Sequence, residues 1–136
     1  MKYDLKLKEI DEKDIQFLYN LLEERKPISY ISHKKMPTYE EHVNFVKSSP
    51  YSKWYIIEVD GKRAGTIYLT KQNEIGIFLN EGLQEKGIGS NALNVLIGKN
   101  PGLRYLANIN PENKKSIKFF KKLGFTLIQY TYELNK

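Results

Sequence analysis

The chain has 136 residues and a mass of 15.9 kDa, the size of one ordinary domain, so we expect residues 1–136 to fold as a single unit. A hydrophobic fraction of 40% and a charged fraction of 28% exclude a disordered tail, and no stretch reaches the roughly twenty apolar residues of a membrane span. The lack of cysteine excludes disulfides, thiolate-bound zinc and thiol nucleophiles, and two histidines are too few for a histidine-rich metal site. These features predict a cytoplasmic protein without a resident metal or a membrane partner.

The formal net charge is +6 and the pI is about 9.3, so the surface attracts anions. Only Arg25, Arg63 and Arg104 are arginines, whereas proteins that read bases favour arginine over lysine. The basic residues are also scattered along the chain. A nucleic-acid partner is therefore not expected, which leaves a phosphorylated small molecule or no specific anion.

The first half of the chain begins with a strand pattern and continues with two helix patterns. Residues 3–10 have apolar side chains at every second position, which predicts a strand with one exposed face. A helix is predicted from Asp11, and residues 26–37 have no clear period and are predicted as a loop. Thr38, with an acid three residues later, has the pattern of a capping box and predicts a second helix that ends before Pro50.

Three strands are predicted next. Residues 54–59 are rich in aromatic and β-branched side chains, and Asp60-Gly61 is a dipeptide preferred in two-residue hairpin turns. Residues 65–70 form the partner strand, and residues 74–80 the third. Together they predict an antiparallel meander.

The last third returns to alternating helices and strands. A glycine-rich turn at residues 84–89 leads into a helix, and residues 104–110 predict a short strand. A helix follows from Asn113 to Gly124, and residues 126–134 predict a final strand. The order β-α-α-β-β-β-α-β-α-β predicts a mixed α/β fold with no internal repeat and no linker.

The strand, glycine-rich turn and helix at residues 75–97 form a candidate anion site. The first turn of a helix has backbone N–H groups without partners, and the helix dipole favours negative charge there. Gly87 and Gly89 would let a phosphate approach the backbone without a Cβ in the way. The same pattern also fits a tight strand-to-helix turn that binds nothing.

Two common phosphate loops do not fit this turn. A Walker loop ends in Gly-Lys-Ser/Thr, whereas Gly89 is followed by Ser90-Asn91. A dinucleotide fingerprint begins a βαβ unit and has an acidic residue about twenty positions later, whereas here a meander precedes the turn and no such acid follows. A dehydrogenase is therefore not expected.

Two stretches resemble signatures of the GNAT N-acetyltransferases. Gln84-x-x-Gly87-x-Gly89 after a strand looks like that family's acetyl-CoA pyrophosphate loop. The family's second signature is a cofactor-flanking helix that ends in Gly-Phe, and it is similar to Asn113-x-x-Ser116-x-x-Phe119-Phe120-x-x-x-Gly124-Phe125. The order of elements also matches over essentially the whole chain. The resemblance implies a twisted, mostly antiparallel sheet flanked by about four helices, with acetyl-CoA (CoA) as cosubstrate.

The resemblance also implies contacts to that cosubstrate. Backbone amides of the turn would hold the pyrophosphate, at Gln84, Lys86, Gly87, Ile88, Gly89 and Ser90. The strand edge would pair with the pantetheine amides, at Ile77, Phe78 and Leu79. The following helix would flank the cosubstrate, through Asn113, Ser116, Phe119 and Phe120. Asn113 and Ser116 are also explained as simple capping residues.

Two departures from the family pattern bear on the reaction. Many members have a tyrosine at the position of Phe120, whose hydroxyl would protonate the departing thiolate, and phenylalanine cannot. The loss is tolerable, because a thiolate whose conjugate acid has a pKa of about 8.5 leaves largely unaided. The family also usually has two strands after the last helix, and only residues 126–134 are available here. The sheet edge left exposed would then pair in a homodimer.

The implied reaction is direct attack of a neutral amine on a thioester carbonyl within a ternary complex. It requires a base or a water relay, and N–H groups that polarise the carbonyl. Glu74 stands where several family members have a carboxylate near the acceptor amine, although a solvated charge on an edge strand explains it equally well. His33 and His42 are the other candidates. Candidate acceptor-binding residues are Tyr30, His33 and His42, with core packing as the alternative for Tyr30 and His42.

Residues 30–45 and 54–57 loosely resemble enzymes that acetylate an amino sugar carried on a nucleotide diphosphate, as in pseudaminic acid biosynthesis. A basic surface suits such a substrate, and aromatic side chains such as Tyr30 or Trp54 would stack on its rings. Two alternatives come from other classes: an N-acetyltransferase acting on a protein or peptide N-terminus or on a small amine, and a non-catalytic acetyl-CoA-binding module. A basic RNA-binding domain is the most distant alternative.

Overall fold

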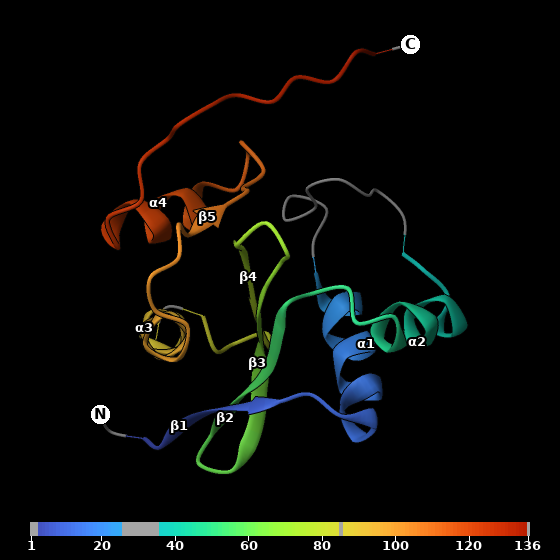
Figure 1. Ribbon diagram of the computed structural model, residues 1–136. Helices are drawn as coiled ribbons and strands as arrows, with labels where there is room; N and C mark the ends of the chain where they lie inside the picture. Colours follow the sequence, from blue (N-terminus) through green and yellow to red (C-terminus); the bar gives the residue numbers. More distant parts are fainter. Residues whose placement is uncertain (1–2, 26–35, 85, 136) are drawn as a thin grey trace.

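The computed structural model describes residues 3–25, 36–84 and 86–135, and a five-stranded sheet lies at its centre (Figure 1). The strands, in their order across the sheet, are β1 (Leu5–Glu9), β2 (Lys53–Val59), β3 (Lys62–Leu69), β4 (Glu74–Leu79) and β5 (Leu106–Ala107). Neighbouring strands are antiparallel from β1 to β4, and β4 is parallel to β5. The mixed, mostly antiparallel sheet confirms the expected fold class.

Helices lie on both sides of this sheet (Figure 1). On one side are α1 (Ile15–Glu24), which follows the short 3-10 helix η1 (Glu12–Asp14), and α2 (Tyr39–Lys47). On the other side are α3 (Ile88–Lys99) and α4 (Lys114–Lys122). No helix in the part of the chain that the structure describes is long and apolar enough to cross a membrane.

The alternation of side chains along the strands builds a core on each face of the sheet. Tyr55 and Ile57 of β2 belong to the cluster that α3 covers, where Leu93 and Leu96 are fully buried. Ile56 lies between them in sequence, is equally buried, and therefore points to the opposite face, toward α1. Both faces of β2 are thus covered, and this explains why its centre is a continuous apolar run.

Local sequence signals account for most element boundaries. The capping box at Thr38 is present: its hydroxyl accepts a hydrogen bond from the Glu41 N–H at 3.1 Å, and the Glu41 carboxylate accepts one from the Thr38 N–H at 2.8 Å. The predicted hairpin turn at Asp60-Gly61 is also confirmed, because φ is +52° and +80° at these two residues, as a two-residue hairpin requires. Residues 26–35, most of the predicted loop, lie outside the described residues.

Two predicted strands differ from the structure. The strand expected over residues 104–110 is reduced to the two residues of β5, because Asn110 already begins a turn in which its side chain accepts from the Glu112 N–H. The final strand expected over residues 126–134 is wrong: residues 126–135 run on from α4 without any ladder pairing (Figure 1). Their alternating pattern is that of a strand, but they pair with no strand of the described chain.

Candidate active site

The glycine-rich turn joins β4 to α3, and Gly87 is the N-cap of that helix. Gly87 has φ of +80°, a left-handed conformation that favours glycine, and it has no side chain to accept from the first-turn amides of α3. The first turn of α3 contains no acidic residue, so its amides face no competing carboxylate on their own helix. Gln84 braces the turn, because its side chain accepts from the Gly82 N–H at 3.1 Å and donates to the Leu79 carbonyl at 3.2 Å.

The two glycines of the turn serve different purposes. Gly87 is exposed and its surroundings are open, with only the Tyr3 hydroxyl near the position of a Cβ, at 3.9 Å. Gly89 is buried, and a Cβ there would lie 3.1 Å from the ring of Phe119 on α4. The expectation that both glycines open the backbone to a phosphate therefore fits Gly87, whereas Gly89 allows α3 and α4 to pack closely.

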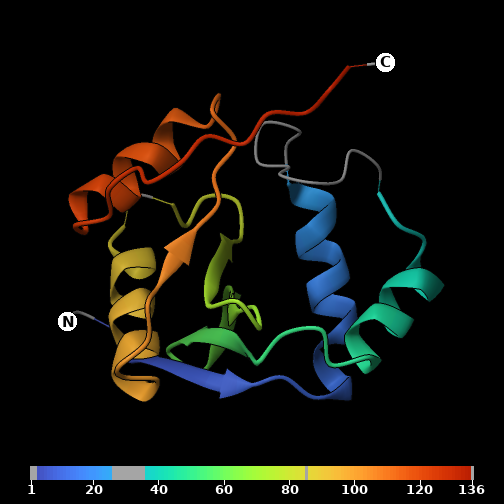
Figure 2. The same cartoon turned by 45° about the horizontal axis from the view of Figure 1, so that its top comes forward.

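The two parallel strands diverge beside this turn. β4 and β5 pair only at Glu74–Leu106 and Ile75–Ala107, while β3 pairs with β4 as far as Leu79. On the side toward β5, the backbone of β4 from residue 76 to residue 79 therefore has no ladder partner among the described residues. The divergence is visible in Figure 2. Ile77 and Leu79 pack against the core beneath α3, and Phe78 points to the opposite face.

The helix α4 completes this side of the molecule. Asn113 is its N-cap and accepts a hydrogen bond from the Ser116 N–H at 3.2 Å, so the capping explanation of Asn113 describes its side chain in this structure. Phe120 is buried and makes edge-to-face contacts with Phe119 and Phe125, with ring centroids 5.0 and 5.1 Å apart. Phe120 is therefore part of the core, which explains why a residue without a hydroxyl is well accommodated there.

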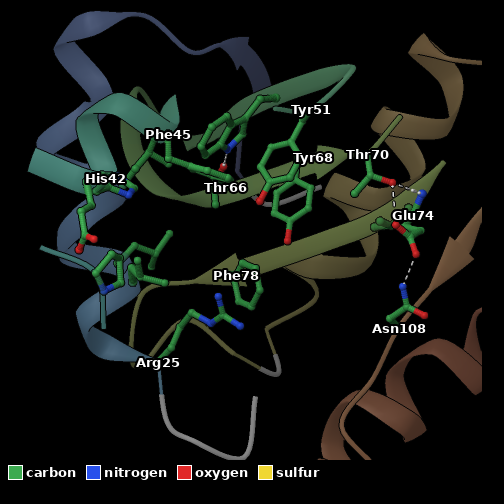
Figure 3. Close-up of a pocket in the computed structure, with 17 residues that line it drawn as sticks. Arg25, His42, Phe45, Tyr51, Thr66, Tyr68, Thr70, Glu74, Phe78 and Asn108 are labelled. Atoms are coloured by element: carbon green, nitrogen blue, oxygen red, sulfur yellow. Dashed lines mark hydrogen bonds between the residues drawn. The ribbon is translucent and has the colours of Figure 1, made fainter. Parts of the chain in front are cut away.

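A cavity of about 620 Å³ lies on the other face of the sheet, between the sheet and the helices α1 and α2 (Figure 3). Aromatic rings form much of its wall: Phe45, Tyr51, Trp54, Tyr68 and Phe78. Tyr51 and Tyr68 are stacked with centroids 3.8 Å apart, and the Trp54 ring meets Tyr51 edge-on at 4.7 Å. Burial raises the pKa of both tyrosine hydroxyls, so they are protonated over the physiological range.

Glu74 is the acidic group at one end of this cavity. One of its carboxylate oxygens accepts from the Thr70 hydroxyl at 3.0 Å, and the other accepts from the Asn108 side-chain amide (Figure 3). Glu74 is also the first residue of β4 and pairs with β5. Two neighbours therefore hold the carboxylate where the aromatic cavity meets the point at which β4 and β5 start to diverge.

His42 lines the same cavity from α2, on the side opposite Glu74 (Figure 3). The residue is only 6% exposed, and its Nε2 atom has no hydrogen-bond partner among the described residues. Burial lowers the pKa of the imidazole, so the ring is neutral at neutral pH. A buried ring nitrogen without a partner on a cavity wall is suited to bind a polar group of a ligand.

The structure brings together only part of the predicted set. Glu74 and His42 lie on one cavity, and the turn at residues 84–90 lies beyond β4; Tyr30 and His33 are outside the described residues. Sequence reasoning missed several wall residues: Arg25, Phe45, Tyr51, Thr66, Tyr68, Thr70 and Asn108. Alternation along the strand predicted over residues 65–70 would have placed Thr66, Tyr68 and Thr70 on one face, but nothing in the sequence marks Asn108.

Comparisons with known proteins identify a family and similar solved structures. A family model described as the acetyltransferase (GNAT) family matches residues 15–125. A search of the curated proteins found no match. Among solved structures, a domain from Methanocaldococcus jannaschii is 24% identical with a TM-score of 0.80, covering 96% of this chain and 94% of that one.

Two further solved structures contain coenzyme A. A ribosomal L7/L12 alpha-N-protein acetyltransferase in complex with coenzyme A is 23% identical, with a TM-score of 0.74 over 92% of this chain and 81% of that one. A spermidine N-acetyltransferase from Vibrio cholerae, in complex with CoA and spermine, is 17% identical with a TM-score of 0.79 over 96% and 88%. At these identities the structures show a shared fold.

The family match spans most of the chain, from α1 to the residue after Gly124, and includes both signatures. This chain belongs to the acetyltransferase (GNAT) family. It is an acyltransferase that uses acetyl-CoA to acetylate an amine.

Proposed function

We propose that the chain transfers the acetyl group of acetyl-CoA to a primary amine by direct attack in a ternary complex, and that residues 1–136 form one catalytic domain. The observation that carries the proposal is the position of Glu74. Its carboxylate faces the aromatic cavity from the first residue of β4, one residue before the pairing with β5 ends. An amine in the cavity and a thioester between the diverging strands would meet beside that carboxylate.

The cosubstrate is proposed to bind along the opposite side of β4. The backbone amides of residues 86–90, around the N-cap Gly87 of α3, would hold the pyrophosphate. The hydrogen bonds of the Gln84 side chain would stabilise the turn. The backbone of Ile77, Phe78 and Leu79 would pair with the pantetheine amides, because that edge of β4 has no ladder partner in the described chain. Asn113, Ser116 and the aromatic pair Phe119–Phe120 would border it from α4.

The proposed chemistry uses Glu74 as the base, directly or through one water. The amine nitrogen attacks the thioester carbonyl carbon, the carbon–sulfur bond breaks, and the ammonium proton passes toward Glu74 while the thiolate leaves. Thr70 and Asn108 hold the carboxylate in place. Phe120 supplies no proton, so the thiolate leaves without an acid from that position. His33 is a second candidate base.

We propose a nucleotide-linked amino sugar as the acceptor. The aromatic wall offers faces on which a sugar or base ring stacks, and the net charge of +6 favours a phosphorylated substrate. His42 Nε2 would bind a polar group of the acceptor at the end of the cavity remote from Glu74. Tyr30 and His33, which lie outside the described residues, are proposed as further acceptor-binding residues. The cytoplasm is the proposed location, because the reaction consumes acetyl-CoA.

A small cationic amine is the second candidate acceptor, and one observation favours it. Among the described residues that line the cavity are two carboxylates, Glu41 and Glu74, and one guanidinium, that of Arg25. Arg25 lies over the Phe78 ring, with its Cζ 3.9 Å from the ring centroid. An excess of carboxylates suits an ammonium group better than a phosphate.

The deciding experiment measures release of CoA thiol from acetyl-CoA with a panel of amines. The panel contains a UDP-linked amino sugar, the free amino sugar, spermidine and a peptide with a free N-terminus. Because the chain has no cysteine, a thiol reagent reports only the CoA released. We expect turnover with at least one amine. In Glu74→Gln the turnover rate should fall by about a hundredfold or more, in line with the usual contribution of a general base.

Glu23→Gln, an exposed carboxylate on α1 outside the cavity, is the matched control and should retain full turnover. A binding module would instead bind acetyl-CoA without turnover with any amine. Normal turnover in Glu74→Gln would remove Glu74 from the mechanism. His42→Gln should raise KM for the acceptor without a comparable fall in the turnover rate.

A further inference from the structure

Tyr68 of β3 extends across β4 at the position of Gly76. The two residues are partners in the sheet, and a Cβ at Gly76 would overlap Cζ and Oη of Tyr68. The end of the phenol ring therefore fills the space that a side chain at position 76 would need. Figure 3 shows the ring on the cavity face of the sheet, with its hydroxyl pointing toward β4. Glycine at position 76 thus lets this hydroxyl reach the neighbouring strand.

Gly76 is also the residue at which β4 loses its neighbour β5. The two strands pair at Glu74 and Ile75, so from position 76 to position 79 this side of β4 has no ladder partner among the described residues. The pantetheine is proposed to lie along that edge, with its thioester end between the diverging strands. The Tyr68 hydroxyl therefore lies where this open edge borders the aromatic cavity.

Glu74 lies next to the same point. Residues at every second position of a strand share a face, so Glu74 and Gly76 of β4 face the cavity together, and Tyr68 and Thr70 of β3 do the same. Thr70 donates to the Glu74 carboxylate at 3.0 Å. A carboxylate that accepts protons and a phenol that donates a hydrogen bond thus lie near each other where the strands begin to diverge.

The environment of Tyr68 suits a donor that keeps its proton. Burial raises the pKa of its hydroxyl, and the charge of Glu74 acts in the same direction. Such a hydroxyl is a poor acid for a departing thiolate, but it is a good donor to an oxygen that gains negative charge. The ring is also fixed in place, because it stacks on Tyr51 with centroids 3.8 Å and planes 1° apart.

We propose that the Tyr68 hydroxyl donates a hydrogen bond to the thioester carbonyl oxygen and is a catalytic residue of the acetyl transfer, a role that rests on the proposed attack of an amine beside Glu74. Tyr68 keeps its proton and stabilises the charge that the oxygen gains while the amine nitrogen bonds to the carbonyl carbon. As the carbon–sulfur bond breaks, that charge returns to the carbonyl and the sulfur leaves as thiolate. The amine proton passes to Glu74.

Infrared difference spectra test this contact without any amine. Acetyl-CoA with and without an isotope label at the acetyl carbonyl carbon is bound to the unchanged chain and to Tyr68→Phe, which keeps the ring and removes only the hydroxyl. A hydrogen bond lowers the stretching frequency of a carbonyl, so we expect a lower frequency on the unchanged chain than on Tyr68→Phe. Equal frequencies would overturn the proposal, whatever the kinetics.

Tyr55→Phe is the matched control. Tyr55 is also buried, but it lies in the core on the opposite face of the sheet, where its hydroxyl accepts from the Asn100 side-chain amide at 3.5 Å. Tyr55→Phe should leave the carbonyl frequency and the turnover rate as they are in the unchanged chain. Thermal unfolding checks that both variants are folded.

Turnover with the best amine of the panel gives the second measurement. Tyr68→Phe should lower kcat about a hundredfold, as the loss of one donor to an oxyanion does, and should leave KM for the amine unchanged. A higher KM with an unchanged kcat would mean that the hydroxyl only binds the acceptor, and the proposal would be wrong. If no amine is acetylated, the proposed function fails, whereas the carbonyl frequency still decides whether Tyr68 contacts the thioester.

Discussion

Asp14 is a carboxylate with no solvent exposure that ties β1, η1 and β3 together. Its two oxygens accept from Lys8 Nζ at 2.7 Å and Arg63 Nε at 2.9 Å, and the Asp11 N–H adds a third bond at 2.9 Å. Burial alone would raise the pKa of this carboxyl group, but these hydrogen bonds outweigh it and hold the pKa below its ordinary value of 3.8. The charged form of Asp14 therefore stabilises the fold.

The stability that Asp14 contributes depends on pH. Because the folded-state pKa of Asp14 is lower than the unfolded one, its contribution is complete at neutral pH and is lost as the pH falls through the folded-state pKa. Asp14→Asn should lower the free energy of unfolding at pH 7 by about 2 kcal/mol, as is typical for hydrogen bonds to charged groups. Below about pH 4 the stability of this variant should fall less steeply than that of the unchanged chain. Urea unfolding at several pH values measures both effects.

Asp4→Asn is the control for this prediction. Asp4 forms an exposed ion pair with Lys6 at 3.7 Å, and such pairs contribute little. Its substitution should change the free energy of unfolding by less than about 0.5 kcal/mol at any pH. Equal losses in the two variants would mean that the buried network at Asp14 has no special stabilising role.

Gly76 and Tyr68 provide a second residue-scale prediction. A Cβ at Gly76 would overlap Cζ and Oη of Tyr68, whose ring lies across β4 and stacks on Tyr51. Gly76→Ala should therefore displace the Tyr68 ring and destabilise the protein by about 1–3 kcal/mol, the usual cost of overpacking. Gly98→Ala in α3, where nothing lies within 4 Å of the new Cβ, should stabilise it by about 0.4–1 kcal/mol.

Denaturant unfolding of the double variant Gly76→Ala/Tyr68→Ala distinguishes overlap from other causes. Removing the ring removes the clash, so the cost of the two changes together should be less than the sum of their separate costs. Strict additivity would show that Tyr68 is not what makes glycine necessary at position 76.

At the scale of elements, the turn before α3 carries a prediction about the cosubstrate. Gly87 and Gly102 both have φ of +80° and open surroundings, so alanine is strained equally at either position, by about 1–2 kcal/mol. Only Gly87 caps α3. Gly87→Ala should weaken acetyl-CoA binding about tenfold or more, which corresponds to about 1.4 kcal/mol, and Gly102→Ala should leave it unchanged.

Isothermal titration of acetyl-CoA into both variants measures this difference. Both variants should lose similar stability, so comparing their affinities separates a binding role of the turn from a general loss of folding. If both bound acetyl-CoA as tightly as the unchanged chain, the amides of α3 would not be the site of the pyrophosphate.

The same scale shows how far the sequence determines the structure. Local signals placed most elements correctly: alternation predicted β1, aromatic and β-branched content predicted β2, and Thr38 and Asp60-Gly61 marked a helix start and a hairpin. Long-range effects were missed. β5 is short because Asn110 begins a turn, and the pattern of residues 126–134 could not reveal that these residues pair with no strand in the described chain.

The candidate site was predictable to the same extent. A motif with fixed spacing located the turn at residues 84–89, since its chemistry depends on the backbone of one continuous segment. The aromatic cavity is assembled from α1, α2 and three strands, so its walls become visible only once these elements are packed. Asn108 is one example, because only the parallel pairing of β4 with β5 brings it to Glu74.

At the scale of the whole molecule, binding of acetyl-CoA should appear as resistance to unfolding. A ligand that binds only the folded state adds about 2.7 kcal/mol at one hundred times its Kd, and for a domain of this size that raises Tm by about 8–10 °C. Acetyl-CoA should produce this shift in a thermal unfolding scan, whereas NAD, ATP and UDP at equal concentration should not. If the turn contacts the phosphates through backbone amides, as proposed, rather than through the surface lysines, the shift should persist at about 0.3 M salt. A shift that vanished with salt and was reproduced by ATP or RNA would point instead to general attraction of polyanions by the basic surface.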